Sequence, residues 1–210
     1  MSLEKKGDFG FEKIEKELSY LKSNQVAVGF FGEDDSLLLT VVRANEYGAH
    51  IVPKNTKYLW VPSSNAILRY GKTVRARDVK GLFVPKGKHV ACVLENGKPV
   101  VYFYLMSKSD IPARPFLRKS LDENKKKYGQ IIKSGIEDIL YKSGTGKKLL
   151  SKLGITAVAD IRRTLTRWTK PGNAPLTIAN KKGQNDPLTD TGDLPKRVTW
   201  KIIPIGGKDE

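Results

Sequence analysis

The chain has 210 residues, enough for one domain or for one domain with an elaboration. Its hydrophobic share of 39% and charged share of 29% are typical of a folded soluble protein. The net charge of +16 is unusual and favours anionic partners such as DNA, RNA, acidic protein faces or membrane surfaces. The single cysteine, Cys92, excludes an intrachain disulfide and a thiolate metal cluster.

The sequence shows no signal for secretion or for insertion into a membrane. Residues 1–10 are polar and charged, unlike the start of a signal peptide. The longest apolar stretch, residues 37–42, is far shorter than the roughly 20 residues that a membrane-spanning helix needs. We therefore expect a chain without a membrane partner that is made in the cytoplasm and works there, or in something assembled there.

The first part of the chain predicts a helix, a strand and a second helix. Apolar residues spaced three and four apart predict a helix over residues 9–22, and residues 25–32 predict a buried strand. The acidic run 33–35 favours the start of the second helix, because carboxylates stabilise the positive end of the helix dipole. Gly48 is typical of the residue that ends such a helix.

From about residue 50 to residue 107 the pattern changes to short β-rich runs. These runs are 51–52, 58–61, 82–84, 89–94 and 100–105. Asn96-Gly97, between the last two, predicts a tight hairpin because both residue types accept positive φ. Residues 63–80 lack a clean period, so we expect a long exposed loop there.

The second half of the chain predicts two helices. An apolar stripe predicts a long helix from Pro115 to about residue 142, and residues 143–146 break it. The next helix carries apolar residues at spacings of three and four between Ile155 and Trp168. Residues 197–205 predict a final strand.

Residues 169–192 form an unusual segment, rich in Pro, Gly, Asn and Thr, with one helical turn at most, at 176–180. Irregular segments longer than about 12–15 residues are uncommon inside compact domains and are often functional or disordered. The apolar Leu176, Ile178 and Leu188 favour an arm that becomes ordered against a neighbouring subunit. A mobile tail is the alternative.

The order of these elements predicts an α+β fold. We expect an N-terminal helix, a small mixed sheet with a β-rich insertion, long helices, and an extended C-terminal arm that ends in a strand. The expected divisions are 1–53 and 108–168 for the α+β core, 54–107 for the insertion, 169–192 for the arm, and 193–210 for the C-terminal strand and tail.

No motif in the sequence predicts catalysis. Residues 144–148 look like part of a phosphate-binding loop, but Tyr141 stands where the first glycine is required and a lysine replaces the final hydroxyl. His50 and His89 are far apart and lack the neighbouring ligands of a zinc site. Cys92 alternates with apolar residues, as a buried structural cysteine does. We therefore expect no enzymatic activity, no cofactor and no metal.

Basic residues gather in two parts of the sequence. Between Lys147 and Lys182 there are nine lysines and arginines and one acid, Asp160, a net charge of +8. A second cluster lies within residues 69–80. Phosphate binding is one hypothesis for both; a solvated face, or one that meets an acidic protein, is the other. The candidate contacts to DNA or another partner are Arg69, Lys72, Arg75, Arg77, Lys147, Lys148, Arg162, Arg163, Arg167, Lys170, Lys181 and Lys182.

Three segments, taken together and in order, carry a family resemblance. They are Ala44-Asn45-Glu46-Tyr47-Gly48, Ile111-Pro112-Ala113-Arg114-Pro115-Phe116-Leu117-Arg118, and a third that runs from Trp168 through Asn173-Ala174-Pro175-Leu176-Thr177-Ile178 and Pro187-Leu188-Thr189-Asp190-Thr191-Gly192-Asp193-Leu194 to Val198-Thr199-Trp200. This pattern resembles the tail-completion and neck proteins of tailed bacteriophages, including the virion morphogenesis proteins of Mu-like prophages. It covers residues 45–48 and 111–200 and leaves 54–107 as an insertion without an assigned role.

The resemblance implies a structural protein of the virion at the head–tail junction, in a ring around the DNA path. The implied partners are further copies of the chain, portal or adaptor proteins, and tail terminator or tail tube proteins. The implied location is the virion, with the host cytoplasm during assembly. The alternative is a nonspecific nucleic-acid-binding accessory protein of phage or prophage origin.

The central motif has a physical interpretation as an architectural corner. Pro112 and Pro115 fix φ and hold the residues between them extended before the long helix begins. Phe116 is then expected to turn into the core, and Arg114 to tie the corner to a carboxylate or a carbonyl oxygen. Asp190, Thr191 and Gly192 complete the architectural set, as a turn or helix cap.

Overall fold

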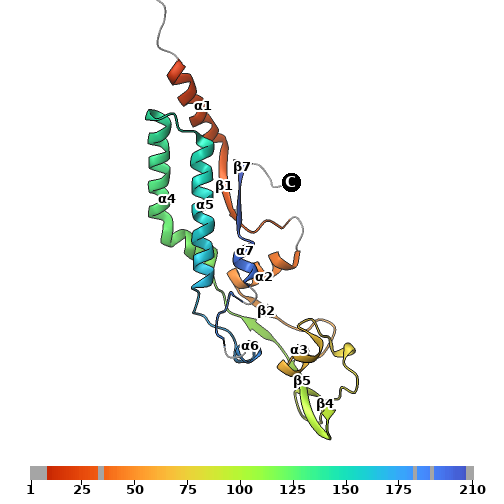
Figure 1. Cartoon of the computed structure of the whole chain (residues 1–210). Coiled ribbons are helices and arrows are strands. Elements are labelled where there is room, and N and C mark those ends of the chain that lie inside the picture. The colour runs from red at the N-terminus through yellow and green to blue at the C-terminus, as the bar shows by residue number, and fades with distance from the viewer. Residues whose placement is uncertain (1–8, 33–35, 182–183, 190–191, 207–210) are drawn as a thin grey trace, which may run out of the picture. The chain divides into compact units, whose positions relative to one another are not determined.

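A computed structural model of the chain describes residues 9–32, 36–181, 184–189 and 192–206 (Figure 1). It has the expected α+β fold, with helices and small antiparallel sheets. The chain divides into two compact units. Unit 1 comprises residues 1–42, 115–168 and 191–210, and unit 2 comprises residues 43–114 and 169–190. The chain therefore passes between the units at four points in the sequence.

Unit 1 combines long helices with a two-stranded ribbon. Its elements are α1 (Phe9–Ser23), β1 (Asn24–Gly29), α4 (Phe116–Tyr141), α5 (Gly146–Thr166), α7 (Asp193–Lys196) and β7 (Thr199–Pro204). Helices α4 and α5 lie side by side, and α5 also packs against both strands (Figure 1). Strands β1 and β7 come from opposite parts of the sequence and pair antiparallel, with Asn24 opposite Pro204.

Helix α5 is the centre of unit 1 because its buried positions repeat every three or four residues. Its buried apolar residues are Leu149, Leu150, Ala157, Val158, Ile161 and Leu165. Gly154 belongs to the same face, where a Cβ atom would lie 2.5 Å from ring carbons of Trp200 in β7. No larger residue fits there unless the indole moves, so the glycine permits the close approach of helix and strand.

Unit 2 is built on a three-stranded antiparallel sheet in the order β3–β5–β4. The strands are β3 (Leu59–Pro62), β4 (Val90–Glu95) and β5 (Lys98–Met106). The turn between β4 and β5 has φ of 50° at Asn96 and 75° at Gly97, as a two-residue hairpin of type I′ requires, so the hairpin prediction is confirmed. A second pair joins β2 (Ala49–Ile51) to β6 (Ser109–Ile111).

Helix α2 (Ser36–Tyr47) spans the first crossing between the units and ends where the sequence predicts. Gly48 follows it with φ of 79°, a conformation that favours glycine. A Cβ atom at Gly48 would also lie 3.0 Å from the carbonyl oxygen of Ile111. The acidic run 33–35, expected to start this helix, lies outside the described residues.

The prediction of an exposed loop over residues 63–80 is wrong. The segment contains α3 (Ser64–Tyr70) and the 3-10 turn η1 (Ala76–Asp78). Ala66, Val74 and Val79 are buried against Tyr102 and Phe103 of β5. Single small apolar residues five to eight positions apart follow no helical or strand period, so only the sheet beneath them decides that they are buried. The one local signal was Ser63, which accepts a hydrogen bond from the Ala66 amide as an N-cap.

Two further expectations about strands are corrected. All the paired strands described here are antiparallel, where a mixed sheet was expected, and they form three separate sheets. Residues 82–84 form no strand; Phe83 makes only an isolated bridge to Cys92. Cys92 is buried, as its apolar alternation predicted.

Residues 169–181 and 184–189 do not form an extended arm in this structure. They include α6 (Pro175–Asn180) and fold onto their own chain within unit 2. Asn180 accepts a hydrogen bond from Ser64 Oγ at 2.8 Å and donates one to the Pro62 carbonyl at 3.3 Å, and Leu188 is buried. Residues 43–53 and 108–114, expected in the core, likewise pack with 54–107. Of the three apolar residues that favoured an arm, Leu188 is buried within the chain itself, whereas Leu176 and Ile178 are half-buried.

Because of these hydrogen bonds, we expect the amides of residues 173–181 and 184–189 to be protected from hydrogen exchange in the isolated chain. Asn173 N–H donates to Asn185 Oδ1 at 2.8 Å, and Ile178 and Lys181 donate to carbonyls one helical turn back. Exchange followed by mass spectrometry on a verified monomer tests this. Exchange as fast as in an unfolded peptide would contradict the structure and restore the arm that orders only in an assembly.

Candidate functional site: an arginine clasp and two basic clusters

Arg114 lies between β6 and α4 and is only 5% exposed, although it carries a charge. Its backbone N–H donates to the Asn45 carbonyl at 2.6 Å. Pro115 follows as the N-cap of α4 with φ of −74°, so the helix begins one residue later than the proline. The two prolines of the motif thus hold an extended connection whose arginine turns inward.

The guanidinium of Arg114 donates to three oxygens from two distant segments. Nη1 donates to Asn45 Oδ1 at 2.9 Å, Nε to the Pro171 carbonyl at 3.1 Å, and Nη2 to the Gly172 carbonyl at 2.7 Å. Burial lowers the pKa of Arg114 from its ordinary value, but an arginine stays charged at any physiological pH. We call Arg114 with these three acceptor residues the arginine clasp. The expectation that Arg114 ties the corner to a carbonyl oxygen is confirmed.

The arginine clasp joins the segments of unit 2 that adjoin three of the four crossings. The chain enters unit 2 at residue 43, leaves it after Arg114 and enters it again at residue 169. Asn45, Arg114, Pro171 and Gly172 all lie within a few residues of these points. The planar guanidinium can donate hydrogen bonds in several directions at once, which suits a residue that connects three segments of the chain.

The other residues of the motif set have different environments. Phe116 is fully buried, as predicted, with its ring edge-to-face against Phe30 at 6.1 Å between centroids. Pro112 is exposed. Gly192 has φ of 77° and is the N-cap of α7, in agreement with the predicted turn or cap. Asp190 and Thr191 lie outside the described residues.

Several residues of the two basic clusters have structural partners. Arg69 Nη1 lies 3.1 Å from Glu95 Oε1 and 3.1 Å from the Tyr102 hydroxyl. Arg162 donates to the Val198 carbonyl at 3.0 Å, and Arg163 pairs with Asp160 at 3.0 Å. These side chains stabilise the fold, and this use could not be foreseen from a count of charges.

The remaining candidates are mostly on the surface. Arg75, Arg77, Lys147, Lys148, Arg167 and Lys170 are exposed, whereas Lys182 lies outside the described residues. The loop before α5 is not a phosphate site, because the Gly146 amide already donates to Glu17 Oε2 at 2.7 Å. The carboxylate occupies the position that a phosphate oxygen would need.

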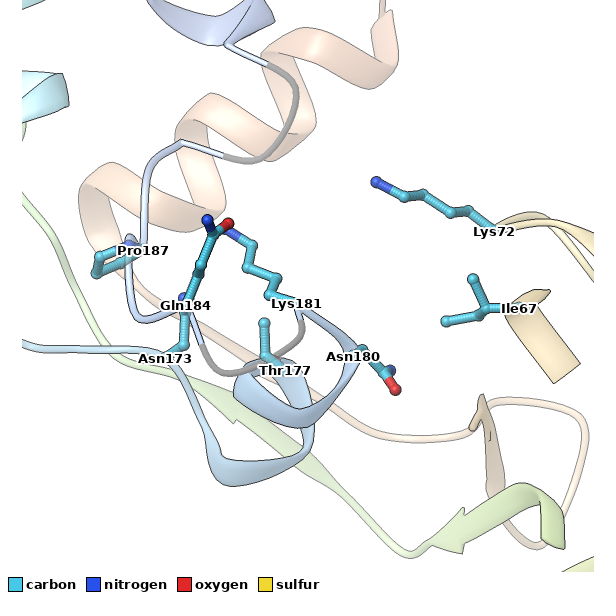
Figure 2. Close-up of a pocket in the computed structure, with 8 residues that line it drawn as sticks. All are labelled: Ile67, Lys72, Asn173, Thr177, Asn180, Lys181, Gln184 and Pro187. Carbon is cyan, nitrogen blue, oxygen red and sulfur yellow. The ribbon is translucent and has the colours of Figure 1, made fainter. Parts of the chain in front are cut away.

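A polar pocket of about 520 Å³ lies between α3 and residues 173–187 in unit 2 (Figure 2). Lys72 extends along one side and Lys181 along the other. Lys181 Nζ donates to the Asp186 carbonyl at 2.8 Å, to Asp186 Oδ1 at 3.0 Å and to the Thr189 carbonyl at 2.6 Å. Three acceptors satisfy the three N–H groups of an ammonium, so Lys181 closes its own loop and offers no donor to an anion.

A buried polar cluster joins α4 to α5 in unit 1. Asp160 is 2% exposed and pairs with Lys127 Nζ and Arg163 Nη1. Burial and a hydrogen bond to Asp160 raise the pKa of Tyr128 to about 12. A buried carboxylate needs such partners, so the cluster fixes how the two helices face each other.

The Tyr128 phenol predicts a pH dependence of stability. Its folded pKa of about 12 lies above the ordinary value of 10.0, so its contribution is complete below pH 10.0 and is lost as the pH rises through about 12. We expect the difference in free energy of unfolding between wild type and Tyr128→Phe to stay constant up to about pH 10. Above that pH, the stability of the wild type should fall relative to that of Tyr128→Phe. Denaturant unfolding across this range tests it, with the phenolate absorbance difference between the two proteins as a direct titration. A midpoint near 10 in that difference would contradict the buried environment.

His50 has an acidic neighbour that the sequence did not indicate. His50 in β2 contacts the Asp110 carboxylate of β6, and this contact lowers the pKa of Asp110. Both side chains are more than half exposed, so the pair is a surface contact. Among the residues that the structure describes, no three His, Cys, Asp or Glu side chains gather where they could hold a metal ion. Within the same ranges, no helix is long and apolar enough to cross a membrane.

Comparison with known proteins adds no relative. No protein-family model, no curated protein and no solved structure matches the chain.

Proposed function

We propose that the chain is a structural subunit of a tailed-phage virion, placed at the head–tail junction in a ring around the DNA path. The observation that carries this proposal is the arginine clasp. The most distinctive residue of the motif that resembles neck and tail-completion proteins is buried, with its donors used on carbonyl oxygens of its own chain. This arrangement supports an architectural role, because the side chain is buried and three of its five N–H donors bond oxygens of its own chain.

Exposed apolar side chains also support assembly into a larger structure. In unit 1, Phe11 is 75% exposed, Leu37 is 71% exposed and Tyr141 is 80% exposed. In unit 2, Leu68 is 79% exposed. Aromatic residues such as Phe11 and Tyr141 are enriched in the buried centres of protein interfaces, so these side chains are candidates for subunit contacts. The candidate partners are further copies of the chain, portal or adaptor proteins, and tail terminator or tail tube proteins, met in the host cytoplasm during assembly.

The second candidate is a nonspecific nucleic-acid-binding accessory protein of phage or prophage origin. The distribution of charge favours it. Unit 2 contains sixteen lysines and arginines against six acids, a net charge of +10, whereas the larger unit 1 has a net charge of +6. Such an excess attracts phosphate backbones regardless of sequence. A ring subunit that touches DNA would share this property, so binding to DNA alone does not separate the two candidates.

Mass photometry on nuclease-treated protein separates them. The nuclease step matters because a chain with a net charge of +16 can be held together by contaminating nucleic acid. We expect closed rings of several copies, and the protein between head and tail in reconstructions of purified virions. A monomer at every concentration that is also absent from virions would overturn the proposal in favour of the accessory protein.

A further inference from the structure

Residues 71–89, which we call the basic loop, are held in a defined conformation. Val74 and Val79 are buried in the core of unit 2. Asp78 Oδ2 accepts a hydrogen bond from the Arg75 amide at 3.0 Å, which closes the turn η1. Phe83 and Cys92 exchange two backbone hydrogen bonds, at 2.9 and 2.8 Å. The backbone of the loop is thus fixed at both ends and at its centre.

The charged side chains of the basic loop face outward. The loop contains six lysines and arginines and one acid, Asp78, a net charge of +5. Arg75, Arg77, Lys80, Lys86 and Lys88 are all exposed. Among the described residues, no carboxylate forms an ion pair with any of these five side chains. Asp78, the one acid of the loop, is used to cap the turn.

The long helix of unit 1 places its charges differently from the loop. On α4, Lys119 pairs with Glu123 and Lys125 with Asp122, and the C-cap residue Lys142 pairs with Asp138, at three- and four-residue spacings. Positive charge there is balanced along the same helix. The basic loop concentrates like charges without such balance, which costs stability through mutual repulsion. An anionic partner removes that cost.

The residue types in the basic loop indicate which kind of anionic partner it suits. Residues 71–89 contain no Asn or Gln, the side chains that read adenine edges, and Phe83 is their one Phe, Tyr or Trp. A stacking platform for single strands needs several exposed aromatic rings. Fixed cations without base-reading or stacking groups suit the regular phosphates of a duplex.

We propose that the basic loop binds the phosphate backbone of double-stranded DNA without sequence preference. This inference deepens the proposed function, because it assigns contact with the DNA path to residues 71–89, the part of the insertion that the family resemblance does not explain. It does not require the basic face of α5, where Arg162 and Arg163 already have intramolecular partners.

Two variants with the same net charge of +11 test the assignment. The loop variant carries Arg75→Gln, Arg77→Gln, Lys80→Gln, Lys86→Gln and Lys88→Gln; the control carries Lys16→Gln, Lys125→Gln, Lys126→Gln, Lys133→Gln and Lys152→Gln in unit 1. Each removes five exposed cations, so the difference in DNA binding between them reports position and not total charge. Thermal unfolding of both variants checks that each remains folded.

Fluorescence anisotropy with two unrelated 30-base-pair duplexes, over a salt series, gives the affinity of full-length wild type and of both variants. We expect equal wild-type affinity for the two duplexes. In the loop variant, we expect the slope of log affinity against log salt to fall by about 4, with at least a ~100-fold loss of affinity at low salt. In the control variant, we expect a loss of less than about tenfold.

Three results would overturn the inference: no duplex binding by wild type, equal losses in the two variants, or binding to an acidic polypeptide in place of DNA. Mass photometry of the same samples separates this inference from the proposed function. If the protein forms rings and the loop variant binds DNA as tightly as wild type, the DNA-binding role of the basic loop is refuted and the proposed head–tail function is not. If the protein is a monomer and the loop variant loses DNA affinity, the proposed ring is refuted and the DNA-binding role of the basic loop is not.

Discussion

Phe116→Ala is expected to lower the free energy of unfolding by about 3–5 kcal/mol. The ring is 0% exposed at the first position of α4 and meets Phe30 edge-to-face, with an interplanar angle of 88°. Removing it leaves a cavity and also removes an aromatic pair. Because Phe30 follows β1 and Phe116 begins α4, this contact ties the ribbon of unit 1 to its long helix.

Leu121→Ala is the matched control, because Leu121 lies on the same helix and is 57% exposed. We expect it to change the free energy of unfolding by about 0.5 kcal/mol or less. Denaturant unfolding of both variants provides the comparison. Wild-type stability in Phe116→Ala would contradict the buried corner and indicate a ring that serves as a docking surface.

Arg114→Met is expected to cost about 3 kcal/mol or more in the stability of unit 2. The substitution removes three hydrogen bonds from a charged donor to Asn45 Oδ1 and the carbonyls of Pro171 and Gly172, and a hydrogen bond to a charged group contributes about 1.5–3 kcal/mol. Arg114→Lys keeps the charge but not the fork, since one ammonium cannot reach three oxygens in the same plane. We expect it to recover only part of the loss.

Hydrogen exchange resolves this effect by position. The amides of Gly172 and Asn173 and those around Asn45 should lose protection in Arg114→Met, because the clasp is their shared support. Arg77→Met, at an exposed arginine of the same unit, is the control and should leave exchange and stability within about 0.5 kcal/mol of wild type. Unchanged protection at Gly172 and Asn173 in Arg114→Met would show that the clasp does not hold these segments.

The sequence by itself determined the elements whose signals are local. The apolar stripes predicted α1 and α4 to within a few residues and the second half of α5, Asn96-Gly97 predicted the hairpin, and Gly48 marked the end of α2. The proline-flanked corner predicted that Phe116 is buried and that Arg114 needs an oxygen acceptor. In each case a few neighbouring residues suffice for the prediction, because an apolar period, a turn that needs positive φ and a proline-flanked corner are all visible in a short stretch of sequence.

Which distant residues serve as partners for these elements is decided only by the folded chain. The acceptors of Arg114 are about 70 residues before it and nearly 60 after it, and no local pattern encodes them. Burial of Val74 and Val79 depends on a sheet made from other segments, and the fold of residues 169–189 depends on Pro62 and Ser64. Basic residues looked equivalent in sequence, but the fold uses Arg69, Arg162 and Arg163 internally and leaves those of the basic loop outside. A count of charge is local, whereas the partner of each charge is a property of the folded chain.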